Sequence, residues 1–324
     1  MPIQIKLKNK LAPDTSPPIK PTVKEVAAGL REFTGEDVSL WHFAMMNDEV
    51  RNGAYDRALG GAVKPGTKVL DIGTGAGLLA LMAARHGGEV TTCEGIPVIA
   101  KKAKEIFQAN GYSEKIRGIE GLSTKLVIGK DVKERFDVLV TEIFDDGLLG
   151  EGAFLAIKHA KEHLLKPGAK IIPESVQVYV MGIESDEFFS HYHVEKAAGF
   201  DVSAFNEFTL QGYIGWHLDK WKWKALTAPT PVFHFDFNQL PNAENRPLDL
   251  EITTAGHLHG LAFWFDLKMD DNTVLSSGPG LAKLSSWKQA LQLYGEGREC
   301  HPGSKIELTA RHDENEIWFS TRNS

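Results

Sequence analysis

The pattern of apolar and polar positions divides the chain into two parts. Between residues 24 and 173, short apolar runs alternate with segments whose apolar residues recur every three or four positions. Such runs predict strands and such segments predict helices. The predicted strands are 69–72, 90–93, 116–120, 136–140 and 170–172, and the predicted helices include 78–85, 99–110 and 152–165. This alternation predicts a doubly wound parallel sheet that binds ligands at the carboxyl ends of its strands.

From about residue 174 to residue 324 the pattern is rich in strands. Runs at 176–183, 232–237, 248–254, 261–267, 305–310 and 317–320 predict a β-barrel or sandwich domain. An insertion at about 191–229 carries three tryptophans and is too long for a structureless loop, so we expect it to pack on something. Residues 1–23 are rich in Lys and Pro and predict a flexible segment.

A glycine loop follows the first predicted strand and opens a helix. Gly73, Gly75 and Gly77 stand directly after the strand that ends Asp71-Ile72. Glycine permits tight turns and a close approach of the backbone, and the start of a helix attracts nucleotide-like ligands. A dinucleotide pattern fails when counted from Gly73 but fits when counted from Gly75, so NAD stays open as a ligand. A purely structural glycine turn is the third possibility.

Three charged residues favour S-adenosylmethionine over NAD. Asp71 would repel a pyrophosphate but would suit the α-ammonium group of S-adenosylmethionine. Glu94, 23 residues later at the end of the second strand, is placed to accept the ribose hydroxyls. Arg51, in the helical segment 41–52, could bind the carboxylate of the methionyl part through two hydrogen bonds. A surface ion pair is the alternative for Arg51.

The loop 141–151 carries two carboxylates at the end of a predicted strand. Glu142 and Glu151 bracket a glycine-containing turn. Together they could bind a guanidinium, which keeps its proton because its pKa is above about 12. Carboxylates on one side would localise the charge there and leave a lone pair on the nitrogen that faces a methyl donor. An acidic surface loop is the alternative.

Four segments together resemble the protein arginine methyltransferases, over about residues 39–320. WHFAMMNDEVRNGAY resembles the helix that covers the cofactor, and VLDIGTGAGLL resembles the S-adenosylmethionine loop. TEIFDDGLLGEGAF resembles the "double-E" loop, and LSSWKQALQLY resembles the "THW" loop. The resemblance implies a Rossmann-like S-adenosylmethionine domain over 24–173 and a β-barrel domain over 174–324. It also implies that the insertion at 191–229 is a dimerisation arm, and hence a homodimer.

The resemblance also implies roles for single residues. The implied cofactor contacts are His42, Arg51, Asp71, Gly73, Gly75 and Glu94, with Ser123 and Thr124 at the adenine. Glu142 and Glu151 would be the catalytic guanidinium clamp, and Met45 would lie over the reacting nitrogen.

Two departures from the family pattern concern substrate and product. Ser286, before Trp287, replaces the histidine of the "THW" loop, which removes a pair with Asp48. Asp145 in the double-E loop resembles the monomethylating subgroup, in which an extra acidic group would narrow the pocket against a second methylation.

Composition adds limits on partners and location. The net charge of −7 disfavours nucleic acid as the main partner, despite the Trp-Lys-Trp-Lys run at 221–224, and mildly favours a cationic substrate. The two cysteines provide no disulfide framework, and no apolar run predicts a membrane span, so a cytoplasmic protein is expected. The His pairs at 191/193 and 257/259 lack a third ligand, so no metal site is predicted.

These observations lead to one hypothesis and two rivals. The hypothesis is an S-adenosylmethionine-dependent arginine N-methyltransferase that adds a single methyl group. Its acceptor is left open between protein or peptide arginine and free L-arginine. The rivals are an inactive scaffold with a methyltransferase fold and, more distantly, an NAD-dependent oxidoreductase. Two costly carboxylates in one pocket argue against the scaffold.

Overall fold

A computed structural model describes residues 40–208, 212–281 and 286–322 of the 324-residue chain. The predicted flexible segment 1–23, the helical pattern between 24 and 39, and Ser285 lie outside these residues. Residues Leu40–Ser324 form one compact unit, to which the following description applies.

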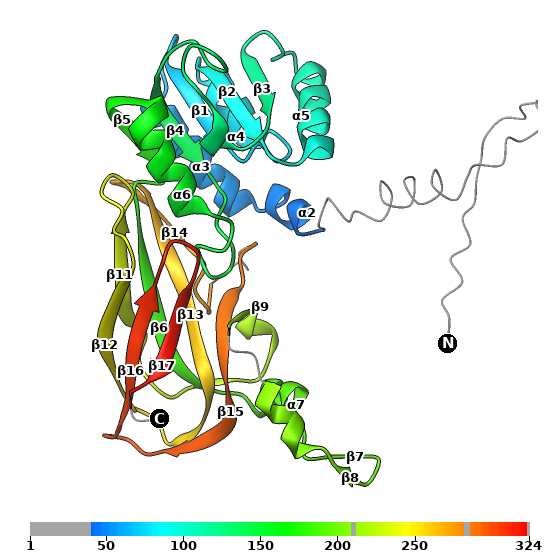
Figure 1. Cartoon of the computed structure of the whole chain (residues 1–324), viewed down its shortest axis with the longest axis vertical. Coiled ribbons are helices and arrows are strands. Elements are labelled where there is room, and N and C mark those ends of the chain that lie inside the picture. The colour runs from blue at the N-terminus through cyan, green and yellow to red at the C-terminus, as the bar shows by residue number, and fades with distance from the viewer. Residues whose placement is uncertain (1–39, 209–211, 282–285, 323–324) are drawn as a thin grey trace, which may run out of the picture. The chain divides into compact units, whose positions relative to one another are not determined.

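Five parallel strands form the sheet of the N-terminal half (Figure 1). They are β1 (Lys68–Ile72), β2 (Glu89–Glu94), β3 (Ile116–Glu120), β4 (Phe136–Thr141) and β5 (Leu165–Ile172). The order in the sheet is β3-β2-β1-β4-β5, so the direction of winding reverses between β1 and β4. Ile72 and Thr141 are register partners, and the loops that follow β1 and β4 therefore start side by side. Such a reversal is where doubly wound sheets bind their ligands.

Helices accompany this sheet in the predicted alternation. They are α2 (Trp41–Met46), α3 (Glu49–Ala62), α4 (Leu78–Arg85), α5 (Pro97–Ala109) and α6 (Ala153–His159). The helix predicted at 152–165 is present as α6, followed by a turn of π-helix at Ala160–Leu164. A short 3₁₀ helix, Ser123–Lys125, follows β3.

Two antiparallel sheets build the barrel domain. The larger contains β6 (Ser175–Glu184), β9 (Ile214–Trp216), β10 (Lys224–Ala225), β11 (Thr230–Asp236), β13 (Gly256–Asp270), β14 (Thr273–Ser276) and β15 (Gln289–Cys300). The smaller contains β12 (Glu244–Glu251), β16 (Lys305–His312) and β17 (Ile317–Thr321). All six predicted strands are present. Strand β15 was not predicted because Gly295, Glu296 and Gly297 interrupt its alternation of apolar and polar residues.

The insertion after β6 has an outer and an inner part. The outer part, residues 186–208, contains α7 (Asp186–Tyr192), the hairpin of β7 (Lys196–Ala197) and β8 (Phe200–Asp201), and a 3₁₀ helix Ser203–Phe208. We call this part the arm (Figure 1). In the inner part, β9 and β10 pair with β15 and β6 of the barrel. The projecting arm is therefore shorter than the range 191–229 predicted from the sequence.

The apolar core continues from the parallel sheet into the barrel. Phe154 of α6 is fully buried and lies edge-on to Phe235 of β11, with ring centroids 4.9 Å apart. The loop 141–151 after β4, which carries Glu142 and Glu151, is called the carboxylate loop. Its Phe144 stacks on Phe237 with ring centroids 5.7 Å apart. The loop that carries Glu142 and Glu151 is thus anchored at the junction of both halves.

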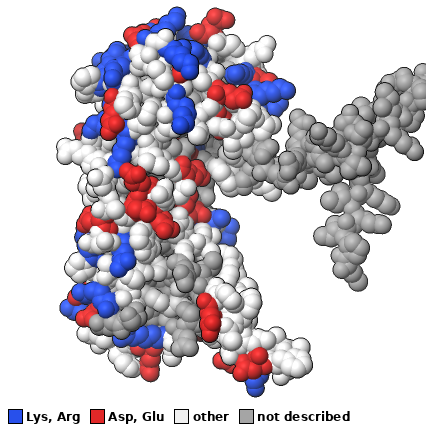
Figure 2. All heavy atoms as spheres, viewed as in Figure 1, with Lys and Arg blue, Asp and Glu red and all other residues white. Residues whose placement is uncertain are grey.

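Charged side chains of both signs are interspersed over the face drawn in Figure 2. None of the helices within the described ranges has the length and apolarity that crossing a membrane requires.

Candidate active site

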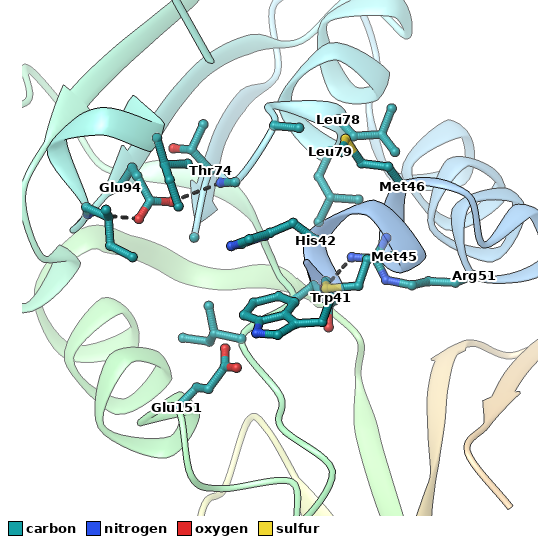
Figure 3. Close-up of a pocket in the computed structure, with 17 residues that line it drawn as sticks. Trp41, His42, Met45, Met46, Arg51, Thr74, Leu78, Leu79, Glu94 and Glu151 are labelled. Atoms are coloured by element: carbon teal, nitrogen blue, oxygen red, sulfur yellow. Dashed lines mark hydrogen bonds and ion pairs between the residues drawn. The ribbon is translucent and has the colours of Figure 1, made fainter. Parts of the chain in front are cut away.

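A pocket lies where the loops after β1 and β4 meet helices α2 and α3 (Figure 3). Eight residues that the sequence pointed to line it: His42, Met45, Arg51, Gly73, Gly75, Glu94, Glu142 and Glu151. Six others do not line it: Asp71, Ser123, Thr124, Asp145, Ser286 and Trp287. The sheet therefore brings cofactor candidates and both carboxylates to one place.

The glycine loop shapes the pocket floor. Gly75 has a φ of +51°, which favours glycine, and no atom of the described residues lies within 4 Å of the position that a Cβ would take. At Gly73 a Cβ would come within 2.5 Å of the Ile143 side chain. Glycine at these two positions lets the loop after β1 pass the loop after β4 closely and leaves backbone open to a ligand.

Glu94 closes the glycine loop from the end of β2. Its Oε2 accepts a hydrogen bond from the Gly75 N–H at 2.9 Å, and its Oε1 accepts one from the Ile96 N–H at 3.0 Å. Both carboxylate oxygens are therefore held at fixed positions in the pocket wall. This is the arrangement that a ribose diol requires of its acceptor.

Asp71 lies beneath the glycine loop and is completely buried. Its Oδ2 accepts from the Thr92 hydroxyl at 2.7 Å, and its Oδ1 has no partner among the described residues. Burial raises the pKa of Asp71 to about 7. Ser123 and Thr124 belong to the 3₁₀ helix that follows β3, the neighbour of β2. The cofactor contacts expected of Asp71, Ser123 and Thr124 remain predictions, as do those of the residues that line the pocket.

A buried ion pair joins Arg51 of α3 to Glu142 of the carboxylate loop. Only 5% of Arg51 and 8% of Glu142 is exposed, so both charges are withdrawn from water. Among the described residues, Arg51 Nε and Glu142 Oε1 have no hydrogen-bond partner. Buried polar atoms are almost always paired. One unpaired donor and one unpaired acceptor at a pocket wall therefore point to ligands that provide an acceptor for the first and a donor for the second.

The environment raises the pKa values of both clamp carboxyls. Burial raises the pKa of Glu142 to about 6, although the Arg51 charge opposes it. Glu151 is exposed as a residue, but its carboxyl group points into the recess beside Trp41 (Figure 3). Withdrawal from water and the charge of Glu142 raise the pKa of Glu151 to about 7. A cationic ligand between the two carboxylates would stabilise their charged forms and lower both pKa values again.

The segment 286–288 holds the site through three hydrogen bonds and contributes no pocket wall. The Ser286 N–H donates to Asp48 Oδ2 at 2.8 Å, and Trp287 Nε1 donates to the Phe144 carbonyl at 2.8 Å. The Lys288 N–H donates to Asp146 Oδ1 at 2.8 Å. Ser286 and Trp287 therefore lie outside the pocket. Ser286 holds the junction of α2 and α3 in place, and Trp287 holds the carboxylate loop.

Asp145 does not line the pocket, and its expected effect on a second methylation stays a prediction. Its Oδ1 accepts the Gly150 N–H at 2.8 Å, and its Oδ2 accepts the hydroxyl of Tyr213. The two bonds turn the carboxylate toward its own loop and toward the barrel. Asp145 thus shapes the loop that carries Glu151.

Sequence reasoning gave no role to Trp41. This tryptophan of α2 stacks on His42, with ring centroids 3.9 Å apart, and lines the pocket above Glu151 (Figure 3). Partial burial lowers the pKa of His42, which keeps this imidazole neutral near pH 7. The sequence offered a signal for this role. Trp41 and His42 begin the helical segment that resembles the cofactor-covering helix, and two adjacent rings at that position are suited to line a pocket. Among the described residues, no three His, Cys, Asp or Glu side chains are grouped as a metal ion would require.

Comparisons with known proteins agree on one family. The arginine methyltransferase oligomerization subdomain matches residues 174–323, and the ribosomal protein L11 methyltransferase family matches residues 56–172. An arginine N(omega)-methyltransferase of Streptomyces achromogenes is 40% identical over 266 residues, which cover 81% of this chain and 73% of that protein. The chain belongs to the arginine methyltransferase family.

More distant relatives extend the comparison. Protein arginine N-methyltransferase 7 of Aedes aegypti is 31% identical over 336 residues, which cover 85% of this chain but 47% of that protein. The chain thus spans about half the length of such relatives, and this similarity fits the monomethylating subgroup.

Solved structures share the fold. A chain of the Trypanosoma brucei PRMT1 enzyme–prozyme complex superimposes with a TM-score of 0.74 at 21% identity, covering 83% of this chain and 86% of that one. Protein arginine methyltransferase 10 of Arabidopsis thaliana gives a TM-score of 0.70 at 20% identity, covering 87% and 97%.

The residues of the pocket fit S-adenosylmethionine, the cofactor of this family. Glu94 offers two acceptors to a ribose, and Arg51 offers a free Nε to a carboxylate. Apolar walls for the adenine and the methionyl chain come from Met46, Leu78, Leu79, Ile96 and Ile99. The family is one of methyltransferases, so the alternative of NAD as the ligand is rejected.

The role of Glu94 can be tested by cofactor-analogue binding. We expect Glu94→Gln to weaken binding of S-adenosylhomocysteine about 10- to 100-fold, because a hydrogen bond to a charged acceptor contributes about 1.5–3 kcal/mol. Isothermal titration calorimetry measures the effect. The control is Glu120→Gln, since Glu120 is the register partner of Glu94 on β3 but is exposed and does not line the pocket. Equal affinities in the two variants would remove Glu94 from the cofactor site.

Proposed function

We propose that this arginine methyltransferase adds one methyl group from S-adenosylmethionine to a guanidino nitrogen of free L-arginine. The observation that carries the guanidino acceptor is the pair Glu142 and Glu151, which face one pocket beside the glycine loop. Free arginine is favoured because the relative with 40% identity is named an arginine N(omega)-methyltransferase. The relatives named for protein arginine are 29–33% identical and match over less than half of their length.

The two carboxylates prepare the acceptor for transfer. S-adenosylmethionine supplies an activated methyl group on its sulfonium sulfur. Glu142 and Glu151 bind the guanidinium on one side, so that its positive charge is held there and the remaining nitrogen faces the cofactor side of the pocket. Arg51 holds Glu142 in place from behind. Fixing the reacting atoms in line provides the rest of the acceleration, because positioning removes most of the entropic cost of the encounter.

A single methylation is supported by the similarity to the monomethylating subgroup and is consistent with the large side chains that line the pocket. Met45, Met46 and Trp41 of α2 and its C-terminal turn lie over the pocket. We infer that these large side chains hinder a methylated nitrogen from turning back toward the donor.

The scaffold hypothesis has no observation in its favour. Burial raises the pKa values of Glu142 and Glu151, so each carboxylate is energetically costly where it stands. A protein that only binds partners would have no physical reason to keep them.

We also propose that the arm docks on a second copy of the chain. Its tip exposes Phe200, Phe205 and Phe208, of which 72%, 69% and 77% is exposed. Phe205 and Phe208 already pack edge-on at 5.4 Å, so they present one apolar surface. Isolated apolar patches of this kind mark interaction sites, and the barrel domain matches a subdomain named for oligomerization.

The acceptor and the product are tested by one assay. Free L-arginine and an arginine-containing peptide are offered side by side with S-adenosylmethionine, and mass spectrometry counts the added methyl groups. We expect one methyl group on free arginine, and a fall in kcat of at least about 100-fold in Glu142→Gln, from the loss of a charged clamp partner. Methylation of the peptide alone, or a second methyl group, would contradict the proposal. Binding of S-adenosylhomocysteine without any turnover would favour the scaffold.

The clamp predicts how activity depends on pH. The substrate guanidinium stays charged, while Glu142 and Glu151 have pKa values of about 6 and about 7, so they must lose protons before they bind it. We therefore expect kcat/KM for arginine to rise with pH from about 6 and to level above about 8. In Glu151→Gln the profile should reach a lower plateau, and its rise should be centred nearer pH 6, because Glu142 is then the one clamp carboxylate that titrates. A flat profile in the wild type would argue against a carboxylate clamp.

The arm is tested by molecular mass in solution. We expect a dimer for the wild type and a monomer for the double variant Phe200→Asp/Phe205→Asp, because buried charges oppose apolar docking. Sedimentation velocity measures both. The control is Val274→Asp, which places the same charge on an exposed apolar residue of β14 outside the arm. A dimer that survives the double substitution would place the interface elsewhere.

A further inference from the structure

We propose that Tyr213 is a positioning residue, which fixes Glu151 through Asp145. The inference deepens the proposed function and rests on it, because Glu151 is taken to bind the acceptor guanidinium. It assigns a role to a tyrosine that lies 68 residues from its partner in sequence and outside the loops that carry the site.

The contacts form a short chain from the barrel to the clamp. The Tyr213 hydroxyl donates to Asp145 Oδ2, and Asp145 Oδ1 accepts the Gly150 N–H at 2.8 Å. Gly150 directly precedes Glu151. Every link after the tyrosine lies within the carboxylate loop, so a shift of the hydroxyl is passed to the backbone beside Glu151.

Tyr213 itself is fixed by the barrel. It directly precedes β9, whose residues Ile214 and Trp216 pair with Leu291 and Gln289 of β15. Its ring lies edge-on to Phe263 of β13, with centroids 5.3 Å apart. The hydroxyl is therefore presented by a rigid sheet, which suits a positioning role.

The carboxylate loop is shaped to receive the tyrosine ring. A Cβ at Gly147 would come within 2.1 Å of the ring of Tyr213, so any side chain at 147 would displace one of them. Next to it, Leu148 is buried and has a φ of +80°, a left-handed conformation that is costly for leucine. The Leu148 N–H donates to the Asp145 carbonyl at 2.9 Å, which closes this turn. A loop in such a conformation needs outside support, and Tyr213 supplies it.

The hydrogen bond between Tyr213 and Asp145 also affects the pKa of Glu151. Asp145 is one of the negative charges that raise the pKa of Glu151, after burial and Glu142. A hydroxyl that donates to Asp145 offsets part of this charge. Loss of the hydroxyl should therefore raise the pKa of Glu151 further and shift the acidic limb of the pH profile upward. A residue with only a packing role would not move this limb.

The test removes the hydroxyl and keeps the ring. In Tyr213→Phe we expect kcat/KM for L-arginine to fall about 10- to 100-fold, as for a lost hydrogen bond to a charged group, with the acidic limb displaced to higher pH. The affinity for S-adenosylhomocysteine, measured by calorimetry, should stay within about twofold, because Asp145 does not line the cofactor pocket. The matched control is Tyr294→Phe, since the Tyr294 hydroxyl is buried in the same domain and has no partner among the described residues.

A double-mutant cycle separates the chain of contacts from two independent effects. Asp145→Asn keeps an oxygen for the Gly150 N–H and removes the anionic acceptor of Tyr213. We expect Tyr213→Phe/Asp145→Asn to be no slower than the slower single variant, whereas independent effects would multiply. Multiplied losses, or wild-type kinetics and pH dependence in Tyr213→Phe, would overturn the inference.

Hydrogen exchange gives a readout that does not need turnover. Amides of residues 145–151 should exchange faster in Tyr213→Phe than in the wild type, while those of β15 should not. Wild-type turnover tests the proposed function, and exchange in the variant tests the positioning role, so the two can fail separately. Unchanged exchange at 145–151 would contradict the positioning role even if the wild type methylates arginine.

Discussion

The buried ion pair between Arg51 and Glu142 is the interaction on which the site depends. Removing both charges from water is expensive, and a buried pair stabilises a fold only when its remaining lone pairs and protons are satisfied. Here Arg51 Nε and Glu142 Oε1 are left without partners among the described residues. The protein bears this cost beside the loops that follow β1 and β4. A cofactor carboxylate would satisfy Arg51 Nε, and a substrate guanidinium would satisfy Glu142 Oε1. The ion pair would then connect the cofactor to the methyl acceptor.

The barrel domain supports the active site from outside the pocket, as far as its described residues show. The carboxylate loop is held on one side by Trp287 and Lys288, and on the other by Tyr213. Stacking of Phe144 on Phe237 fixes its base. A loop that must hold two like charges close together against their repulsion needs rigid support, and sheet strands provide it better than other loops do. This explains in physical terms why the barrel domain belongs to the catalytic unit, although none of its described residues lines the pocket.

Periodicity in the sequence was enough to predict the parallel sheet and the six barrel strands. It also placed the glycine and carboxylate loops at one edge, because the carboxyl ends of parallel strands lie on the same side of a sheet. It was not enough for β15, where glycines break the alternation, or for the inner limit of the arm, where β9 and β10 are too short to show a period. The direction of Asp145 also escaped prediction, because it is set by Tyr213, whose position depends on tertiary structure. Local patterns place side chains on elements, but contacts distant in sequence decide where loop side chains point.

The replacement of the family histidine by Ser286 shows how a site can change without losing its geometry. Asp48 accepts two backbone N–H groups, from Arg51 at 2.9 Å and from Ser286 at 2.8 Å. Backbone donors are present whatever the side chain, so the connection between α3 and the segment 286–288 does not require an imidazole. Transfer of a methyl group to a guanidinium releases one proton, which must leave the pocket. Glu151 lies at the exposed end of the clamp, so a proton taken up by its carboxylate has a direct route to water. Such a route does not depend on the side chain at position 286, so the site can lack the family histidine and still release the proton.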